Sequence, residues 1–204
     1  MKAVIFDYGC VLSLPQDGAE IRKMAGLLGL GVDSFIGAYW EFRQAYDAAE
    51  LTATEYWRRV AERGGVAADP ASVPQLTRSD ARSWARRDPA MTPWLRRLKD
   101  SGLKVALASN MPVDVKTYVV RRFGWLRRLD WLTFSCDLRV TKPDARIFQH
   151  CLGGLGVQPR EALLFDDHSE NVSAAASLGI AARLFCTAQE AAAELEQLCS
   201  RRLI

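Results

Sequence analysis

The chain has 204 residues, of which 49% are hydrophobic and 25% are charged, and its formal net charge is +3. This length suits one ordinary domain or a core domain with an insertion, and the composition excludes a disordered or fibrous protein. Paired arginines recur along the whole chain among 24 acidic residues, so we expect solvated helix faces and no nucleic-acid-binding surface.

The cysteines and the first residues predict where the protein works. Five cysteines, an odd number without a CxxC spacing, argue against a disulfide framework or a zinc site. Only four apolar residues stand between Lys2 and Asp7, too few for a signal peptide, and no stretch approaches the roughly 20 apolar residues of a membrane span. We expect a cytoplasmic monomer or homodimer with reduced thiols that binds neither nucleic acid nor membranes.

The first part of the chain changes pattern after a single strand. Residues 2–7 form a short apolar run that ends in an acid, which is typical of a buried strand in a parallel sheet. Residues 15–88 instead show helical periodicity, for example at Tyr39, Phe42, Arg43 and Tyr46. We predict that 15–88 form a small helical domain inserted into an α/β core made of residues 1–14 and 89–204.

Strands and helices alternate from residue 89 onward. We predict strands over 104–108, 132–135, 163–165 and 181–185, and helices over 93–101, 112–123, 144–153, 169–178 and 188–201. Such alternation implies a parallel sheet with right-handed crossovers. The expected fold is α/β, a doubly wound, Rossmann-like parallel sheet with an inserted all-helical unit.

Polar residues follow the carboxyl ends of the predicted strands. In open α/β sheets, ligands bind at these ends. Crowded carboxylates there call for a hard dication such as magnesium, and one of them can attack phosphorus to form an acyl phosphate. A lysine, a hydroxyl and backbone amides can hold the phosphoryl oxygens. The residues in question are Asp7 with Gly9 and Cys10, then Ser109 and Asn110, Lys142, and Asp166 with Asp167.

Four segments, in this order, resemble the four motifs of haloacid dehalogenase (HAD) superfamily hydrolases, in the subgroup that contains sugar-1-phosphate phosphatases. They are FDYGCVL at Asp7, ALASN at Ser109, TKPDARIF at Lys142 and LFDDHSENVSAAASLGI at Asp166–Asp167. The helical insertion matches the cap that such enzymes carry between the first two motifs.

The resemblance implies a role for each residue. Asp7 would be the nucleophile and a metal ligand, and Ser109 and Lys142 would bind the phosphoryl oxygens. Asp166 and the backbone carbonyl of Gly9 would ligate Mg²⁺. Asp167 would ligate the ion or orient its water.

Two positions depart from the family pattern. Most phosphatases of the family carry a second Asp, a general acid and base, where this chain has Gly9. His168 is a candidate replacement because histidine titrates near neutrality, although an exposed polar residue at a helix start is the plainer interpretation. A glycine is common where this chain has Arg139. Cys10 as a catalytic thiol is disfavoured because no arginine follows it closely.

The leading hypothesis is a Mg²⁺-dependent phosphohydrolase for a small phosphorylated metabolite, for example a sugar phosphate. Arg43 and Tyr46 lie three apart on one predicted helix face, which could meet the leaving group. One alternative is a 2-haloacid dehalogenase, which needs no metal. Another is a non-catalytic binding protein, degenerate at Gly9.

Overall fold

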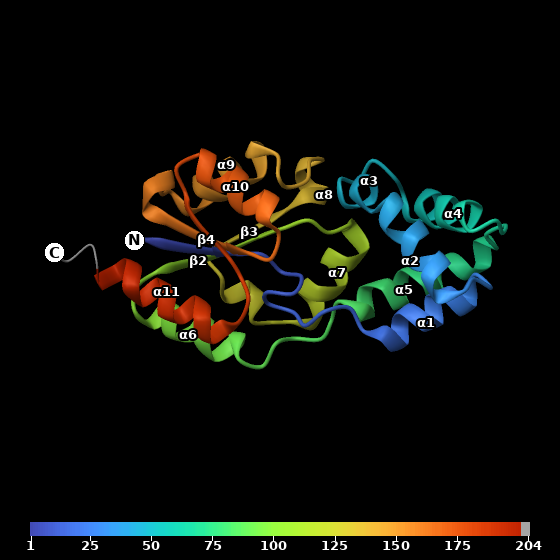
Figure 1. Ribbon diagram of the computed structural model, residues 1–204, viewed down its shortest axis with the longest axis horizontal. Coiled ribbons are helices and arrows are strands. Elements are labelled where there is room, and N and C mark those ends of the chain that lie inside the picture. Colours follow the sequence, from blue (N-terminus) through green and yellow to red (C-terminus); the bar gives the residue numbers. More distant parts are fainter. Residues whose placement is uncertain (201–204) are drawn as a thin grey trace.

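A computed structural model describes residues 1–200, with the side chains of residues 1–198. Five parallel strands form one sheet in the order β3-β2-β1-β4-β5 (Figure 1). This topology confirms the predicted doubly wound parallel sheet. The strands are β1 (Ala3–Phe6), β2 (Lys104–Ser109), β3 (Trp131–Phe134), β4 (Ala162–Asp166) and β5 (Ala181–Leu184).

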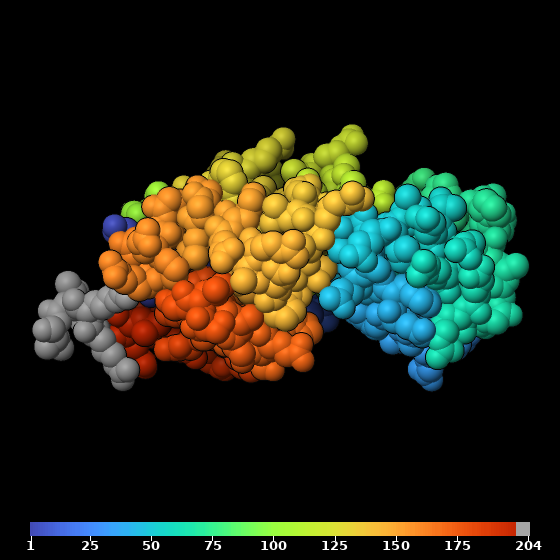
Figure 2. All heavy atoms as spheres, turned by 90° about the horizontal axis from the view of Figure 1, so that it is seen from above, coloured from blue at the N-terminus to red at the C-terminus, as the bar shows by residue number. Residues whose placement is uncertain are grey.

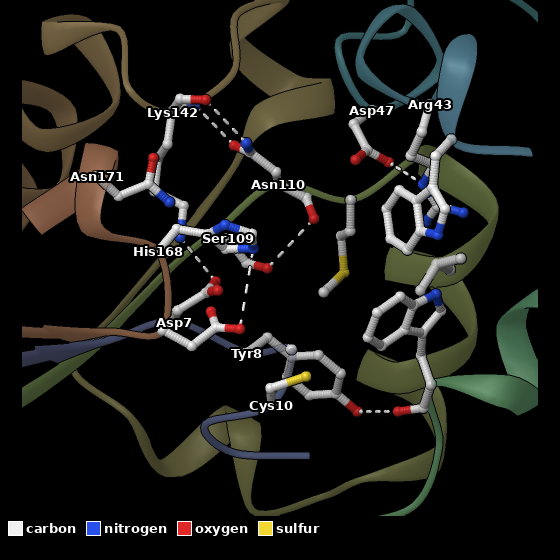
Figure 3. A pocket seen from close by; sticks show the side chains of 16 residues that line it. Asp7, Tyr8, Cys10, Arg43, Asp47, Ser109, Asn110, Lys142, His168 and Asn171 are labelled. Atoms are coloured by element: carbon white, nitrogen blue, oxygen red, sulfur yellow. Dashed lines mark hydrogen bonds and ion pairs between the residues drawn. The ribbon is translucent and has the colours of Figure 1, made fainter. Parts of the chain in front are cut away.

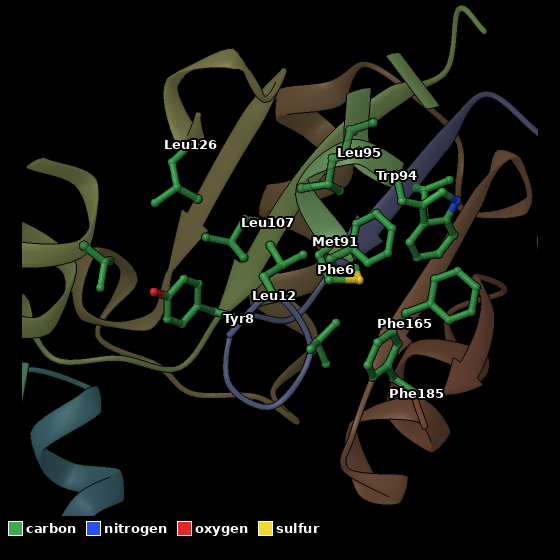
Figure 4. Packing of buried hydrophobic residues seen from close by; sticks show 14 of the residues in the cluster. Phe6, Tyr8, Leu12, Met91, Trp94, Leu95, Leu107, Leu126, Phe165 and Phe185 are labelled. Atoms are coloured by element: carbon green, nitrogen blue, oxygen red, sulfur yellow. The ribbon is translucent and has the colours of Figure 1, made fainter. Parts of the chain in front are cut away.

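Alternate side chains of the strands enter two separate apolar cores, one on each face of the sheet. On one face, Phe6 stacks on Phe165 at 5.7 Å between ring centroids and meets the edge of Trp94 (Figure 4). On the other face, Ile5 and Leu164 pack beneath the helices that cover that side. Because both faces are buried, the strands appear in the sequence as continuous apolar runs.

Five helices and two short turns cover the sheet. The first face is covered by α6 (Met91–Asp100), α7 (Val113–Arg122) and α11 (Ala188–Ser200), and the second by α9 (Ala145–Leu155) and α10 (Ser169–Ser177). The 3₁₀ turns are η2 (Leu126–Arg128) and η3 (Pro159–Glu161). The predicted end of the last helix, at residue 201, lies outside the described residues. No helix within residues 1–200 has the length and the hydropathy that crossing a bilayer requires.

The segment between β1 and β2 folds into a helical lobe with its own apolar core. This lobe lies beside the rest of the molecule (Figure 2). It contains α1 (Gly18–Leu27), α2 (Val32–Glu41), α3 (Arg43–Asp47), α4 (Ala53–Arg63), η1 (Pro70–Ser72) and α5 (Val73–Ser83). Its entry and exit segments pair with each other, since Leu14 N–H donates to the Arg86 carbonyl at 2.6 Å and Asp88 N–H to the Leu12 carbonyl at 3.2 Å. The insertion is therefore all-helical, as predicted.

A short helix that the sequence did not predict follows β3. This helix, α8 (Ser135–Leu138), ends at Arg139, whose backbone is left-handed with φ of 56°. A left-handed residue at a helix end favours glycine, which has no Cβ to clash. The conformation thus gives the physical reason why glycine suits this position. The Arg139 guanidinium donates to the Ala49 carbonyl of the helical lobe at 3.3 Å.

Candidate active site

The carboxyl ends of the strands bring the predicted motif residues into one buried cluster (Figure 3). Lys142 lies at its centre, with its ammonium nitrogen 2.8 Å from Asp7 Oδ1 and 2.6 Å from Asp166 Oδ2. The three residues are 4%, 7% and 0% exposed, respectively. Ser109, at the end of β2, lines a cavity that Asp7 and Lys142 also line. The structure thus gathers four segments that are separated by up to 159 positions in the chain.

The side-chain amide of Asn110 fixes the backbone of Lys142. Its nitrogen donates to the Lys142 carbonyl at 3.1 Å, and its oxygen accepts from the Lys142 N–H at 2.7 Å. Both ends of the amide therefore position the lysine. The Asn110 side chain thus uses both of its polar atoms on the backbone of Lys142.

The helix after β4 orients Asp166. Its Oδ1 accepts from the His168 N–H at 3.0 Å and from the Asn171 amide at 2.9 Å, while Oδ2 accepts from Lys142. Sequence reasoning did not identify Asn171. Its position five residues after Asp166, in the first turn of α10, was the available signal.

The carboxylates of Asp7, Asp166 and Asp167 each place an oxygen within 4.8 Å of the others. Burial raises the pKa of Asp7, and the charge of Lys142 lowers it in part. The carboxylates of Asp166 and Asp167 raise this pKa further. Burial also raises the pKa of Asp167. Among the described residues, Asp167 Oδ1 is buried without a hydrogen-bond partner.

These carboxylates fit a divalent cation. One ammonium balances one of the three carboxylates, so two negative charges remain when all are ionised. Oxygen ligands of this kind, together with an unpartnered buried oxygen, suit Mg²⁺.

The turn after Asp7 is tight and brings Gly9 and Cys10 to the cavity. The Tyr8 carbonyl accepts from the N–H groups of Leu12 at 2.9 Å and Ser13 at 2.8 Å. Burial, and then the charges of Asp167 and Asp7, raise the pKa of the Cys10 thiol to about 11. Since the thiolate is the nucleophilic form, a protonated Cys10 is a poor nucleophile at neutral pH.

The helical lobe supplies the other wall of the cavity, which has a volume of about 360 Å³. Arg43 reaches it, but its guanidinium is held by Asp47 Oδ1 at 2.8 Å and Asp80 Oδ2 at 3.0 Å. The Tyr46 hydroxyl instead donates to Asp114 of α7 at 2.9 Å. The predicted Arg43–Tyr46 face is therefore divided between a cavity wall and a contact with the core.

The sequence did not single out several residues of this wall. Asp47 follows Arg43 by four positions, a spacing at which helical ion pairs form, so it could have been identified. Trp40 and Trp84 of the wall carry no comparable local signal, and neither does Asp80, which pairs with Arg43. His168 lines the cavity, and its imidazole is 73% exposed and 3.8 Å from Asp167 Oδ2.

Comparison with known proteins identifies the family. A family model described as haloacid dehalogenase-like hydrolase matches residues 1–179. The chain belongs to this family. The HAD resemblance of the four motifs is thereby confirmed, and the protein is a hydrolase with phosphatases among its relatives.

Relatives of this HAD hydrolase differ in how much of their length it spans. The sesquiterpene phosphatase astK of Aspergillus oryzae is 26% identical over 198 residues, which cover 97% of this chain and 96% of that protein. Mouse acyl-CoA dehydrogenase family member 10 is 30% identical over 217 residues, and this chain spans only 19% of its length. A HAD family enzyme of Bacteroides thetaiotaomicron, solved in complex with magnesium and inorganic phosphate, shares the fold with a TM-score of 0.72. It is 18% identical, and the match covers 92% of this chain and 96% of that one.

Proposed function

We propose that this HAD hydrolase is a Mg²⁺-dependent phosphatase that acts on a small phosphorylated metabolite through an aspartyl-phosphate on Asp7. The observation that carries the proposal is the buried carboxylate cluster, which Lys142 neutralises only in part and in which Asp167 Oδ1 lacks a partner among the described residues. The phosphatase relative in Aspergillus oryzae supports the same chemistry. In this proposal residues 15–88 act as the cap over the site.

Each motif residue has a role in the proposed reaction. Asp7, Asp166, Asp167 and the carbonyl of Gly9 would hold Mg²⁺. When bound, the ion would neutralise the carboxylates and the charge on the phosphoryl oxygens. Ser109, Lys142 and the backbone amides at Gly9, Cys10 and Asn110 would bind the remaining phosphoryl oxygens.

The proposed reaction has two displacements at phosphorus. Asp7 Oδ1 contacts Lys142, and the second oxygen, Oδ2, attacks the phosphorus. The bond to the leaving oxygen breaks, and its electron pair departs with that oxygen. Water then attacks the acyl phosphate, which restores the Asp7 carboxylate and releases inorganic phosphate together with the proton of the water.

The cluster favours this reaction over the two alternatives. Displacement of a halide requires no dication, and it would leave the charges of Asp166 and Asp167 without a function. A degenerate binding protein would not need Lys142 held between two carboxylates at 2.8 and 2.6 Å. A cytoplasmic location and a monomeric or homodimeric state stay predictions of the sequence.

A release assay tests the proposal. We expect the purified protein to liberate phosphate from members of a panel of phosphorylated metabolites, sugar phosphates included, when Mg²⁺ is present. Asp7→Asn, which is nearly isosteric, should lose more than about a hundredfold in kcat, since loss of a nucleophile typically costs far more than this. Release of phosphate by Asp7→Asn at the wild-type rate would refute the proposal, as would full activity in excess chelator.

A further inference from the structure

The Trp84 indole lies against the backbone of Gly9, at the place where a side chain would begin. The backbone of Gly9 is not left-handed, so its conformation does not call for glycine. A Cβ built at this position would lie 3.2 Å from Cζ3 of the Trp84 indole, closer than ordinary van der Waals contact. A side chain at position 9 would therefore require the indole or the turn to shift by a few tenths of an ångström.

Trp84 is held in this place by one hydrogen bond to its backbone and one from its indole ring. Its carbonyl accepts from the Tyr8 hydroxyl at 3.1 Å, and its indole N–H donates to the Tyr39 hydroxyl at 3.3 Å. Tyr39 in turn donates to Asp80, the partner of Arg43, at 2.6 Å. The polar edge of the indole thus faces the helical lobe, and its carbon edge faces the turn that follows the nucleophile.

A second tryptophan extends this apolar wall. Trp40 meets Trp84 edge to face, with ring centroids 6.3 Å apart and an angle of 81° between the rings. Trp40 is 49% exposed although it is a large hydrophobic residue, and both rings line the cavity that holds Asp7 and Ser109. Met111 and Val115 complete the wall from the side of the core.

At this cavity the Arg43 guanidinium, through Nε and Nη1, and the Asp47 carbonyl already have partners within the protein. Arg43 is shared between Asp47 and Asp80, and the Asp47 carbonyl accepts from the Ser135 hydroxyl at 2.6 Å. A sugar would require free donors and acceptors for its hydroxyl groups, because buried polar groups without partners are costly. A flat apolar ring needs none, and it can pack against indoles in edge-to-face or offset geometry.

Gly9 also offers no acidic side chain that could protonate the leaving group. A phenol has a pKa of about 10, as in tyrosine, and leaves as phenoxide far more readily than an alkoxide. In the first displacement the electron pair of the P–O bond stays on the phenoxide oxygen, which takes its proton from water after departure. The tryptophan wall and the absence of an acid at position 9 therefore favour the same chemistry.

We infer that the preferred substrates are aryl phosphates, the phosphate monoesters of phenols, whose ring packs against Trp84 and Trp40. The inference rests on the proposed phosphatase activity and assigns the class of hydroxyl compound that this activity releases.

The test compares kcat/KM for 2-naphthyl, phenyl, farnesyl and acetyl phosphates and glucose 1-phosphate. Acetyl phosphate has a good leaving group but no ring, so it reports the phosphatase activity alone. We expect the aryl esters to exceed both glucose 1-phosphate and farnesyl phosphate. Equal or better turnover of the sugar or the isoprenoid ester would overturn the aryl assignment and leave the phosphatase standing. Failure with every substrate, acetyl phosphate included, would overturn both.

Variants separate ring recognition from general effects on activity. Trp40→Ala, at an exposed position, should lower the ratio of naphthyl to acetyl phosphate turnover by roughly 2- to 10-fold, the range for one aromatic contact. Trp131→Ala removes another partly exposed tryptophan, on β3, and should leave this ratio unchanged. An equal fall for both substrates in Trp40→Ala would overturn the inference.

The pair at positions 9 and 84 gives a second, independent readout. Gly9→Asp alone should lose activity because its side chain meets the indole. Adding Trp84→Gly should restore turnover and make the rate less dependent on the leaving-group pKa. A double variant with the wild-type dependence would contradict the exclusion of an acid by Trp84.

Discussion

Arg43 provides the sharpest test of how the helical lobe is built, because its side chain joins two buried carboxylates. It is 4% exposed, and its partners Asp47 and Asp80 are 7% and 1% exposed. The guanidinium also lies 5.1 Å from the Tyr39 ring centroid and 5.8 Å from that of Tyr46. Arg43→Met keeps much of the volume and removes the charge and the donors.

Removal of one partner from a buried ion pair costs about 3–5 kcal/mol, because the other partner stays buried without compensation. For a protein of this size each kcal/mol corresponds to roughly 2–4 °C in Tm, so we expect a loss of about 6–20 °C. The control is Arg58→Met. Its ion pair with Glu62 at 2.6 Å is about half exposed, and its loss should cost less than about 0.5 kcal/mol.

The pH dependence of this loss follows from Asp47. Burial raises the pKa of Asp47 from 3.8 to about 6, while Arg43 opposes the shift. A carboxyl whose pKa is higher in the folded than in the unfolded state destabilises the fold above that pKa, and the cost is relieved as pH falls toward the unfolded value. Without Arg43 the shift should grow. The deficit of Arg43→Met should therefore be larger at pH 8 than at pH 5.

Urea or thermal unfolding of the two variants at both pH values measures these effects. A cost for Arg43→Met no greater than that for Arg58→Met would refute the reasoning. If Arg43→Met kept its stability but lost turnover, Arg43 would instead be a substrate-binding residue.

Three further predictions concern the site and its surroundings. Addition of Mg²⁺ without substrate should raise Tm by mass action, and Asp167→Asn should reduce the increase; an equal increase in both proteins would contradict the metal assignment. Cys10→Ser should retain turnover within about tenfold, since the protonated thiol of Cys10 is a poor nucleophile. Iodoacetamide at pH 7.5 should alkylate the exposed Cys186 before Cys10. Alkylation in the reverse order would argue for a reactive Cys10. Arg139→Gly should raise the free energy of unfolding by up to about 1 kcal/mol because it relieves a left-handed backbone; a loss of stability would show that the contact with Ala49 matters more.

Local sequence patterns predicted the sheet and the motif residues because each depends on its own strand. A strand buried on both faces must be apolar until it ends, so the polar residue that follows marks the ligand-binding edge. Asp7 and Asp166 were predictable for this reason. The helix α8 was not, since four residues are too few to show helical periodicity.

The tryptophan wall formed by Trp84 and Trp40 could not be predicted, because it depends on contacts between residues far apart in the chain. Trp84 follows α5 and meets Gly9 only because the insertion folds back, and no local pattern distinguishes it from the other five tryptophans. Likewise Asp80 pairs with Arg43 across 37 positions. The sequence showed that position 9 has no acidic side chain, and the fold showed that the Trp84 indole lies beside it.

Trapping the phosphorylated enzyme tests the central claim most directly. The protein is mixed with acetyl phosphate and Mg²⁺, quenched in acid within milliseconds to seconds, and digested for mass spectrometry. We predict a phosphoryl group on Asp7 that hydroxylamine removes, and none on Asp7→Asn. Continued release of phosphate without any label on Asp7, or a label on Cys10 or His168 instead, would contradict the account.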